Sequence, residues 1–207
     1  MTDASGCGGP APVILVVCTG NVCRSPLIER LLQPTLDDAF GADAVEVRSA
    51  GTGALVGAPM DERAAQILSD LGGDADGFVA RHLEPRMVAE GSLVLTATRE
   101  HRAAAVRLHP PAMRHTFTIL ELAALLGAVD TASLTLDPTG RIAGLAQLAR
   151  EGRGRLAGQG LESIDIVDPF RRPDDVYELM REQIAPAIDI IRAALTPGTE
   201  HAGGRPG

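Results

Sequence analysis

Cys18 and Arg24 are the two side chains of this sequence whose types and spacing best support chemistry, because they bracket the short segment CTGNVCR. A cysteine ringed by amide donors and close to an arginine has its thiolate favoured over its thiol, and the thiolate is the nucleophile. A planar guanidinium holds two oxygens of a phosphoryl group, which leaves the phosphorus above the sulfur for in-line attack. The pair therefore predicts cleavage of a phosphate monoester through a phosphocysteine.

The residues next to this pair favour a tight loop that opens into a helix. Gly20 and Asn21 accept unusual backbone angles, so successive N–H groups are expected to point inward. Ser25 is interpreted as the helix N-cap and Pro26 as the first helical residue, which directs the positive end of the helix at Cys18. We expect a concavity that binds a tetrahedral oxyanion. The residues predicted to line it are Thr19, Gly20, Asn21, Val22, Cys23 and Ser25.

Two other interpretations of Cys18 are less favoured. A buried, inert cysteine at the end of a core strand would leave Gly20, Asn21 and Arg24 unexplained. A zinc site is disfavoured because Cys18 and Cys23 lack the spacing of a zinc knuckle, and no histidine pair follows at ligand spacing. The expected reaction uses no metal ion and no cofactor. Cys23 is interpreted either as a buried residue lining the loop or as a thiol that forms a disulfide with oxidised Cys18.

Three motifs resemble those of the low-molecular-weight protein-tyrosine phosphatases, over about residues 12–196. CTGNVCRSP after the run VILVV is similar to the signature loop of that family. The stretch Ser49–Thr52 resembles the second recurring motif. Asp168-Pro169-Phe170 resembles the third, an Asp-Pro followed by an aromatic residue, and the motifs stand in the family's order.

The resemblance implies a division of catalytic roles. Cys18 would be the nucleophile, Arg24 would hold the phosphoryl oxygens, and Asp168 would be the general acid that later activates the hydrolytic water. Asp137-Pro138 competes with Asp168-Pro169 for the third motif, but Asp168 stands directly before an aromatic residue and a helix. The implied partner is a phosphorylated protein.

The resemblance also implies four supporting residues. Ser25 would hydrogen-bond the thiolate, and Asn21 would hold the loop in its unusual backbone shape. Ser49 and Thr52 would brace the loop, although ordinary turn chemistry explains them equally well.

The sequence departs from the family pattern at the cleft wall. In residues 53–59, where many relatives place an aromatic residue against the substrate ring, this chain has Leu55 and Val56. Leu55 and Phe170 are therefore the expected wall, and the reduced stacking surface leaves the leaving group open.

A second departure is an insertion at residues 127–163. Ile142, Leu145 and Leu148 predict a short amphipathic helix, followed by a mobile, glycine-rich end at residues 152–158. The insertion is interpreted as a lid, a docking surface or a tolerated addition.

Four functions fit these motifs. Hydrolysis of tyrosine phosphate is favoured by Val22, because relatives of that type carry an aliphatic residue there. Phosphoarginine phosphatases carry threonine at that position. Arsenate reduction on the same fold needs further resolving cysteines, and none follows Cys23. A catalytically inactive phosphate-binding adaptor is the alternative outside enzymology, and the presence of Cys18, Arg24 and Asp168 disfavours it.

The elements that must position these residues alternate as in an α/β fold. Val13–Val17 predicts a buried parallel strand that delivers Cys18 at its carboxyl end. We expect one doubly wound domain, with a four-stranded parallel sheet, helices on both faces and the phosphate-binding loop at the carboxyl edge. The other predicted strands lie near residues 45–49, 92–96 and 115–118, and the predicted helices include 60–71, 99–108, 119–126 and 174–195.

A histidine- and arginine-rich cluster around residues 99–115 allows two interpretations. It is either a cationic rim that attracts an acidic partner or a solvated helix face, and the solvated face is favoured for most of its residues.

Composition narrows the class of protein. A chain of 207 residues is long enough for one sizeable domain, here residues 12–196 between tails at 1–12 and 197–207. A net charge of −8 and 2% aromatic residues argue against nucleic-acid binding. Three cysteines, no secretory signal and no membrane-spanning run favour a cytoplasmic protein without membrane insertion. The oligomeric state is left open.

Overall fold

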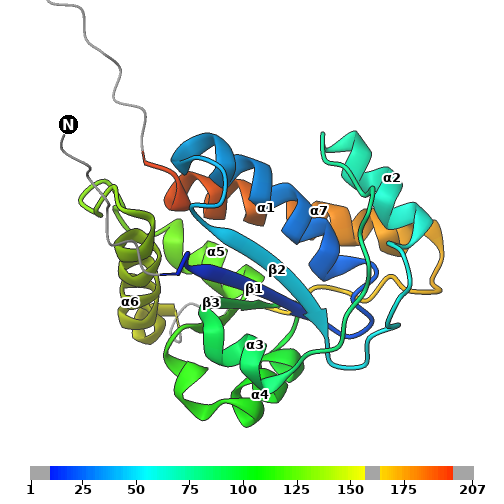
Figure 1. Cartoon of the computed structure of the whole chain (residues 1–207), viewed down its shortest axis with the longest axis horizontal. Helices are drawn as coiled ribbons and strands as arrows, with labels where there is room; N and C mark the ends of the chain where they lie inside the picture. The colour runs from blue at the N-terminus through cyan, green and yellow to red at the C-terminus, as the bar shows by residue number, and fades with distance from the viewer. Residues whose placement is uncertain (1–9, 157–163, 198–207) are drawn as a thin grey trace, which may run out of the picture.

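The sheet is organised around β1 (Val13–Cys18), whose six residues are all buried in this computed structural model. The structure describes residues 10–156 and 164–197. Four parallel strands lie in the order β2-β1-β3-β4 (Figure 1). The partners of β1 are β2 (Glu46–Gly51) and β3 (Gly91–Thr96), and β4 (Thr116–Thr118) pairs with β3.

Parallel pairing brings the carboxyl ends of the strands to one edge, as the sequence predicts. Cys18 pairs in register with Gly51, so the end of β1 lies beside the end of β2. The next residues of both strands therefore start their loops side by side. The predicted α/β fold with a four-stranded parallel sheet is confirmed.

Side chains of β1 alternate between two hydrophobic cores, one on each face of the sheet. Ile14 and Val16 belong to the larger core, and Leu15 and Val17 belong to the smaller one. The helices of the larger core are α1 (Arg24–Phe40), α2 (Glu62–Asp70), α5 (Ile119–Leu126), α6 (Pro138–Leu156) and α7 (Asp174–Leu195). The other face is covered by α3 (Pro85–Glu90), α4 (Arg99–Leu108) and the short 3-10 helix η1 (Pro110–Arg114).

Helix α1 contains Pro34 in its interior. A proline removes one helical hydrogen bond and should kink or end the helix, yet α1 continues through Pro34 to Phe40. The carbonyl of Leu31, one turn before this point, accepts hydrogen bonds from Thr35 Oγ1 (3.3 Å) and from the guanidinium of Arg192 on α7. These donors thus reach the carbonyl of Leu31, next to Arg30, whose own carbonyl loses its helical N–H donor at Pro34.

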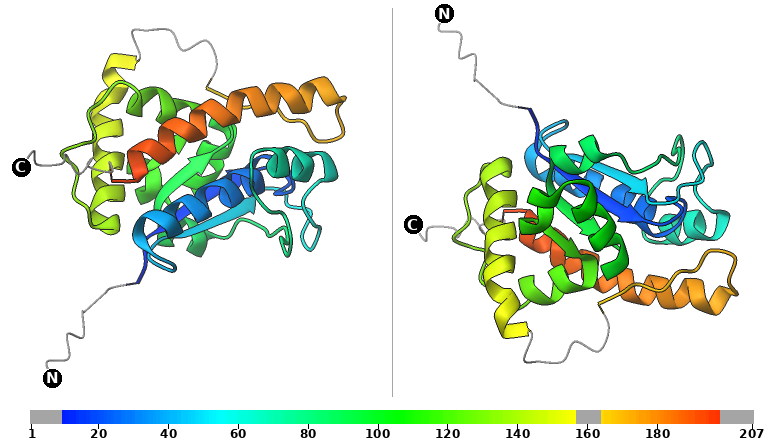
Figure 2. Two further views of the ribbon diagram at one scale, coloured as in Figure 1. Left: turned by 90° about the horizontal axis from the view of Figure 1, so that it is seen from above. Right: turned by 90° about the horizontal axis from the view of Figure 1, so that it is seen from below.

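The insertion contains a longer helix than the sequence predicts. α6 runs for 19 residues and includes Gly152, because Ile142 and Leu145 on one side of it are buried in the larger core. Arg141 extends to the end of α7, where it donates to the carbonyl of Ala194 (3.0 Å) and to that of Thr196 (2.8 Å). Figures 1 and 2 place α6 at the end of the sheet where the strands begin, opposite the edge that carries Cys18. α6 is therefore not a lid over Cys18.

Three segments named in the sequence analysis lie wholly or partly outside the described residues. These are most of the two predicted tails, 1–9 and 198–207, and the end of the insertion, 157–163. Within the described part of the chain, no helix combines the length and apolar character needed to cross a membrane.

Candidate active site

Cys18 ends β1 and is almost fully buried, with 2% of its surface exposed. Helix α1 begins at Arg24, two residues earlier than the predicted start at Pro26, and its N-cap position is Cys23, which makes no capping side-chain bond. Ser25 therefore lies inside the first turn and is not the N-cap. Its hydroxyl instead lies 3.0 Å from Cys18 Sγ. The uncapped helix end faces the loop with its positive pole, which suits an anion.

Asn21 is the hydrogen-bonding centre of the loop. It is fully buried and has the left-handed backbone angle φ of 54°, so the predicted unusual conformation falls on Asn21 and not on Gly20. Its Nδ2 donates to Ser25 Oγ (2.9 Å) and to Ser49 Oγ (2.8 Å). Its Oδ1 accepts from the backbone N–H of Arg81 (2.8 Å). One side chain thus joins the loop to α1, to β2 and to the segment before α3.

This network determines which way the serine hydroxyls point. Because Arg81 N–H needs an acceptor, Nδ2 of Asn21 must face Ser25 and Ser49, and both serine oxygens accept from it. The hydroxyl hydrogen of Ser49 is donated to the carboxylate of Glu29. The hydroxyl hydrogen of Ser25 is left for Cys18 Sγ, so Ser25 donates to the sulfur.

Glu29 terminates this chain of hydrogen bonds inside the protein. It lies on α1, 8% exposed, and burial raises the pKa of its carboxyl group. Arg81 lies 3.8 Å away and partly offsets that effect.

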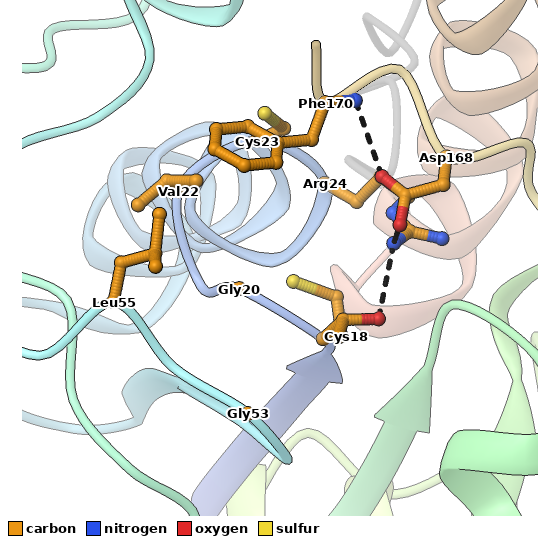
Figure 3. A pocket seen from close by; sticks show the side chains of 10 residues that line it. Cys18, Gly20, Val22, Cys23, Arg24, Gly53, Leu55, Asp168 and Phe170 are labelled. Atoms are coloured by element: carbon orange, nitrogen blue, oxygen red, sulfur yellow. Dashed lines mark hydrogen bonds and ion pairs between the residues drawn. The ribbon is translucent and has the colours of Figure 1, made fainter.

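Arg24 and Asp168 meet across the mouth of the loop. Arg24 is 3% exposed, and its Nη2 lies 2.6 Å from Oδ2 of Asp168, whose side chain is half exposed (Figure 3). Arg24 Nη1 donates to the carbonyl of Ile166 (3.3 Å), while Nε is buried without a partner. Phe170 N–H donates to Asp168 Oδ1 (3.2 Å), which orients the carboxylate toward the loop.

A cavity of about 160 Å³ opens above Cys18. Apolar side chains form much of its wall, with Val22 and Leu55 on the side opposite Asp168 (Figure 3). Both predicted wall residues, Leu55 and Phe170, line it. The full lining is Cys18, Thr19, Gly20, Val22, Cys23, Arg24, Gly53, Leu55, Asp168 and Phe170.

The second motif follows the loop along its outer side. Thr52 N–H donates to the carbonyl of Cys18 (2.9 Å), and Gly53 N–H donates to that of Thr19 (3.0 Å). The Thr52 hydroxyl is 3.5 Å from the same Cys18 carbonyl, at the limit of a hydrogen bond. A Cβ on Gly51 would lie 2.3 Å from the Thr19 carbonyl oxygen, so only glycine permits this approach.

Residues 13–139 match the family model described as low molecular weight phosphotyrosine protein phosphatase. The chain belongs to this family. A curated relative is the low molecular weight protein-tyrosine-phosphatase Etp of Escherichia coli K12, 32% identical over 167 residues, which is 80% of this chain and 82% of Etp. The predicted family and enzyme class are confirmed.

Solved structures of similar fold cover most of this phosphatase. The YwlE arginine phosphatase from Geobacillus stearothermophilus is 27% identical with a TM-score of 0.62, covering 89% of this chain and 92% of YwlE. A low molecular weight protein tyrosine phosphatase from T. tengcongensis is 26% identical with a TM-score of 0.61, and the match covers 87% of this chain and 97% of the T. tengcongensis chain.

One residue of the histidine-rich cluster, His101, does not lie on a solvated helix face in the phosphatase. His101 is 6% exposed, and its Nε2 lies 2.9 Å from Thr19 Oγ1 in the loop. Arg99 is paired with Asp165, and Arg102 with Glu121, so these two arginines are not a free cationic rim. The helical register of α4 turns His101 inward, because it shares the buried side of that helix with Ala105.

Sequence reasoning also missed Glu29, Arg81 and Tyr177 in the phosphatase. Glu29 sits one turn after Ser25 on α1, a spacing that places both side chains on one helix face. Arg81 contributes its backbone N–H to Asn21 and its charge to Glu29, and both partners are distant in the sequence. Tyr177 of α7 is 2% exposed and lies near Cys23, whose pKa burial raises to about 12.

Across residues 10–156 and 164–197, no cluster of three or more His, Cys, Asp or Glu side chains is placed to hold a metal ion.

Proposed function

We propose that this phosphatase hydrolyses phosphotyrosine in proteins through a phosphocysteine formed on Cys18. The observation that supports this most is the convergence of Cys18, Arg24 and Asp168 on one cavity. Cys18 Sγ, which receives the hydroxyl of Ser25, attacks phosphorus from the floor of the cavity. Loop amides, the start of α1 and Arg24 hold the phosphoryl oxygens.

Asp168 serves as the general acid in this proposal. In the structure its carboxylate is paired with Arg24. A dianionic phosphate that binds Arg24 breaks this pair, and its charge favours a proton on Asp168. Asp168 then protonates the leaving oxygen and, as a carboxylate, activates the water that hydrolyses phosphocysteine.

The wall of the cavity supports an aromatic leaving group. Val22, Leu55 and Phe170 offer apolar contact on the sides of the space, and Phe170 offers the ring face. A phosphoarginine substrate is the second candidate, because the similar YwlE structure is an arginine phosphatase. Val22 in place of threonine favours tyrosine.

The test is turnover of three substrates: an aryl phosphate, a phosphotyrosine peptide and a phosphoarginine peptide of the same sequence. We expect vanadate-sensitive hydrolysis, loss of turnover in Cys18→Ser, and a higher kcat/KM on phosphotyrosine than on phosphoarginine. Asp168→Ala should reduce turnover by orders of magnitude on the peptide and less on an aryl phosphate whose leaving group needs no proton. Faster hydrolysis of phosphoarginine would replace the substrate assignment, and undetectable turnover of all three would refute the proposal.

A further inference from the structure

His101 makes side-chain contacts that the reaction described above does not use. It lies in the first turn of α4, and Thr98, the N-cap residue, accepts a hydrogen bond from its backbone N–H (3.3 Å). Its Nδ1 lies 2.7 Å from Thr98 Oγ1, and its Nε2 lies 2.9 Å from Thr19 Oγ1. Both ring nitrogens are therefore engaged, one within α4 and one on the phosphate-binding loop.

The ring of His101 is neutral near pH 7. Burial, and next the positive charge of Arg24, lower the pKa of His101 to about 4. A neutral imidazole has one N–H donor and one acceptor nitrogen, so its two neighbours cannot both be donors or both be acceptors toward it.

Two tautomers of His101 satisfy these contacts, because Thr98 Oγ1 can either donate its hydrogen to Nδ1 or accept a second hydrogen bond from it. In the tautomer considered below, Nδ1 accepts from Thr98, and Nε2 carries the ring hydrogen and donates it to Thr19 Oγ1.

The second neighbour of Thr19 is Arg24. Its Nη2 lies 3.4 Å from Thr19 Oγ1 and, as a guanidinium nitrogen, can only donate. His101 and Arg24 together occupy both acceptor positions of the Thr19 oxygen. The hydroxyl hydrogen of Thr19 is thereby turned away from both of them, and Thr19 lines the cavity above Cys18.

We propose that His101 is a positioning residue that holds the Thr19 hydroxyl as a hydrogen-bond donor to the phosphoryl group in the cavity. Thr19 would be a side-chain ligand of the phosphate in addition to the loop amides and Arg24. This inference rests on the proposed function for its catalytic consequence, but the binding of a phosphate-like anion tests it independently.

The experiment compares variants that preserve or remove the Nε2 donor. His101→Gln places an amide nitrogen near the position of Nε2, whereas His101→Asn reaches only as far as Nδ1. Thr19→Val removes the hydroxyl with little change of shape. His82→Asn, at an exposed histidine, is the matched control for the substitution. Urea unfolding of each variant establishes that it is folded.

The measurements are kcat/KM on an aryl phosphate and the dissociation constants of vanadate and inorganic phosphate. One hydrogen bond to a charged group predicts about a tenfold loss in kcat/KM and in anion affinity for Thr19→Val and for His101→Asn. His101→Gln should retain clearly more of both than His101→Asn. In the Thr19→Val background, His101→Asn should add less than about a twofold further loss, because the residue acts through Thr19.

Two results would overturn the inference. One is an unchanged anion affinity in Thr19→Val. The other is a double variant whose loss of kcat/KM and anion affinity equals the product of the two single-variant losses, since the histidine would then act independently of Thr19 and only stabilise α4. If the wild-type phosphatase fails to turn over any substrate, the proposed function fails, and the anion affinities alone still decide the role of His101.

Discussion

Asn21→Asp is the sharpest single substitution for testing how the loop activates Cys18. The introduced carboxylate has nearly the same shape, tolerates the left-handed backbone and still accepts the N–H of Arg81. It removes both donors of Nδ2, so Ser25 and Ser49 each face an acceptor where they faced a donor. The hydroxyl of Ser25 then turns to that carboxylate and away from Cys18 Sγ.

The size of the effect follows from the one hydrogen bond lost at the sulfur. A hydrogen bond to a charged group contributes about 1.5–3 kcal/mol, which corresponds to roughly a 10- to 100-fold lower kcat/KM. Asn21→Gly is the matched control, because it loses three hydrogen bonds, at about 1 kcal/mol of unfolding free energy each, but leaves Ser25 free to donate to Cys18.

The assays are hydrolysis of an aryl phosphate, alkylation of Cys18 by iodoacetate at neutral pH, and urea unfolding. Asn21→Asp should slow both hydrolysis and alkylation more than Asn21→Gly does. The unfolding free energy of Asn21→Gly, measured in urea, should be about 3 kcal/mol lower than that of wild type. The reasoning is refuted if Asn21→Asp stays within threefold of wild type in both reactions, or if Asn21→Gly is the slower enzyme.

Three further predictions test other parts of the site. Gly51→Ala should destabilise the protein by about 2 kcal/mol or more, because its Cβ would lie 2.3 Å from the Thr19 carbonyl oxygen. The control Gly53→Ala, whose nearest contact would be 3.8 Å, should be nearly neutral. Equal urea midpoints for the two variants would contradict this prediction. Asp168→Asn should bind vanadate up to about fivefold more tightly, since it removes an ion pair whose half-exposed carboxylate limits it to about 1 kcal/mol; weaker binding would count against the pairing. The pKa of His101 is about 4 in the folded protein, lower than its unfolded value of about 6.5, so its contribution to stability is complete above pH 6.5 and is lost as pH falls toward 4. Over this pH window the unfolding free energy of wild type should fall by about 3 kcal/mol more than that of His101→Gln. Parallel curves of stability against pH would disprove the shift.

Much of the site was predictable because its residues follow one another along the chain. The run before Cys18 has the composition of a buried strand, and the loop ends in a helix six residues later, so Cys18 and Arg24 were brought together by local geometry alone. Asp168 was predicted through its motif, although its distance from Arg24 depends on how the loop before α7 returns to the sheet edge.

The residues that were missed act across the fold. His101 is separated from Thr19 by 82 positions, and only the parallel pairing of β1 with β3 brings the start of α4 to the loop. The start of α1 was placed two residues late, because Ser25 resembles an N-cap but its hydroxyl is drawn to Cys18 by the hydrogen bonds of Asn21. The length of α6 depends on a burial partner, the larger core, that its glycine-rich sequence does not reveal.

The Arg24–Asp168 ion pair has a consequence for the end of the catalytic cycle. Its carboxylate oxygen lies 2.6 Å from the guanidinium that the proposed mechanism assigns to phosphate, so the resting protein carries an internal competitor for its own product. In that mechanism, each inorganic phosphate that leaves is replaced by a carboxylate that is tethered to the protein and always present. Asp168 would thereby also assist product release, and it would weaken inhibition by free phosphate by up to about fivefold, as the half-exposed ion pair allows.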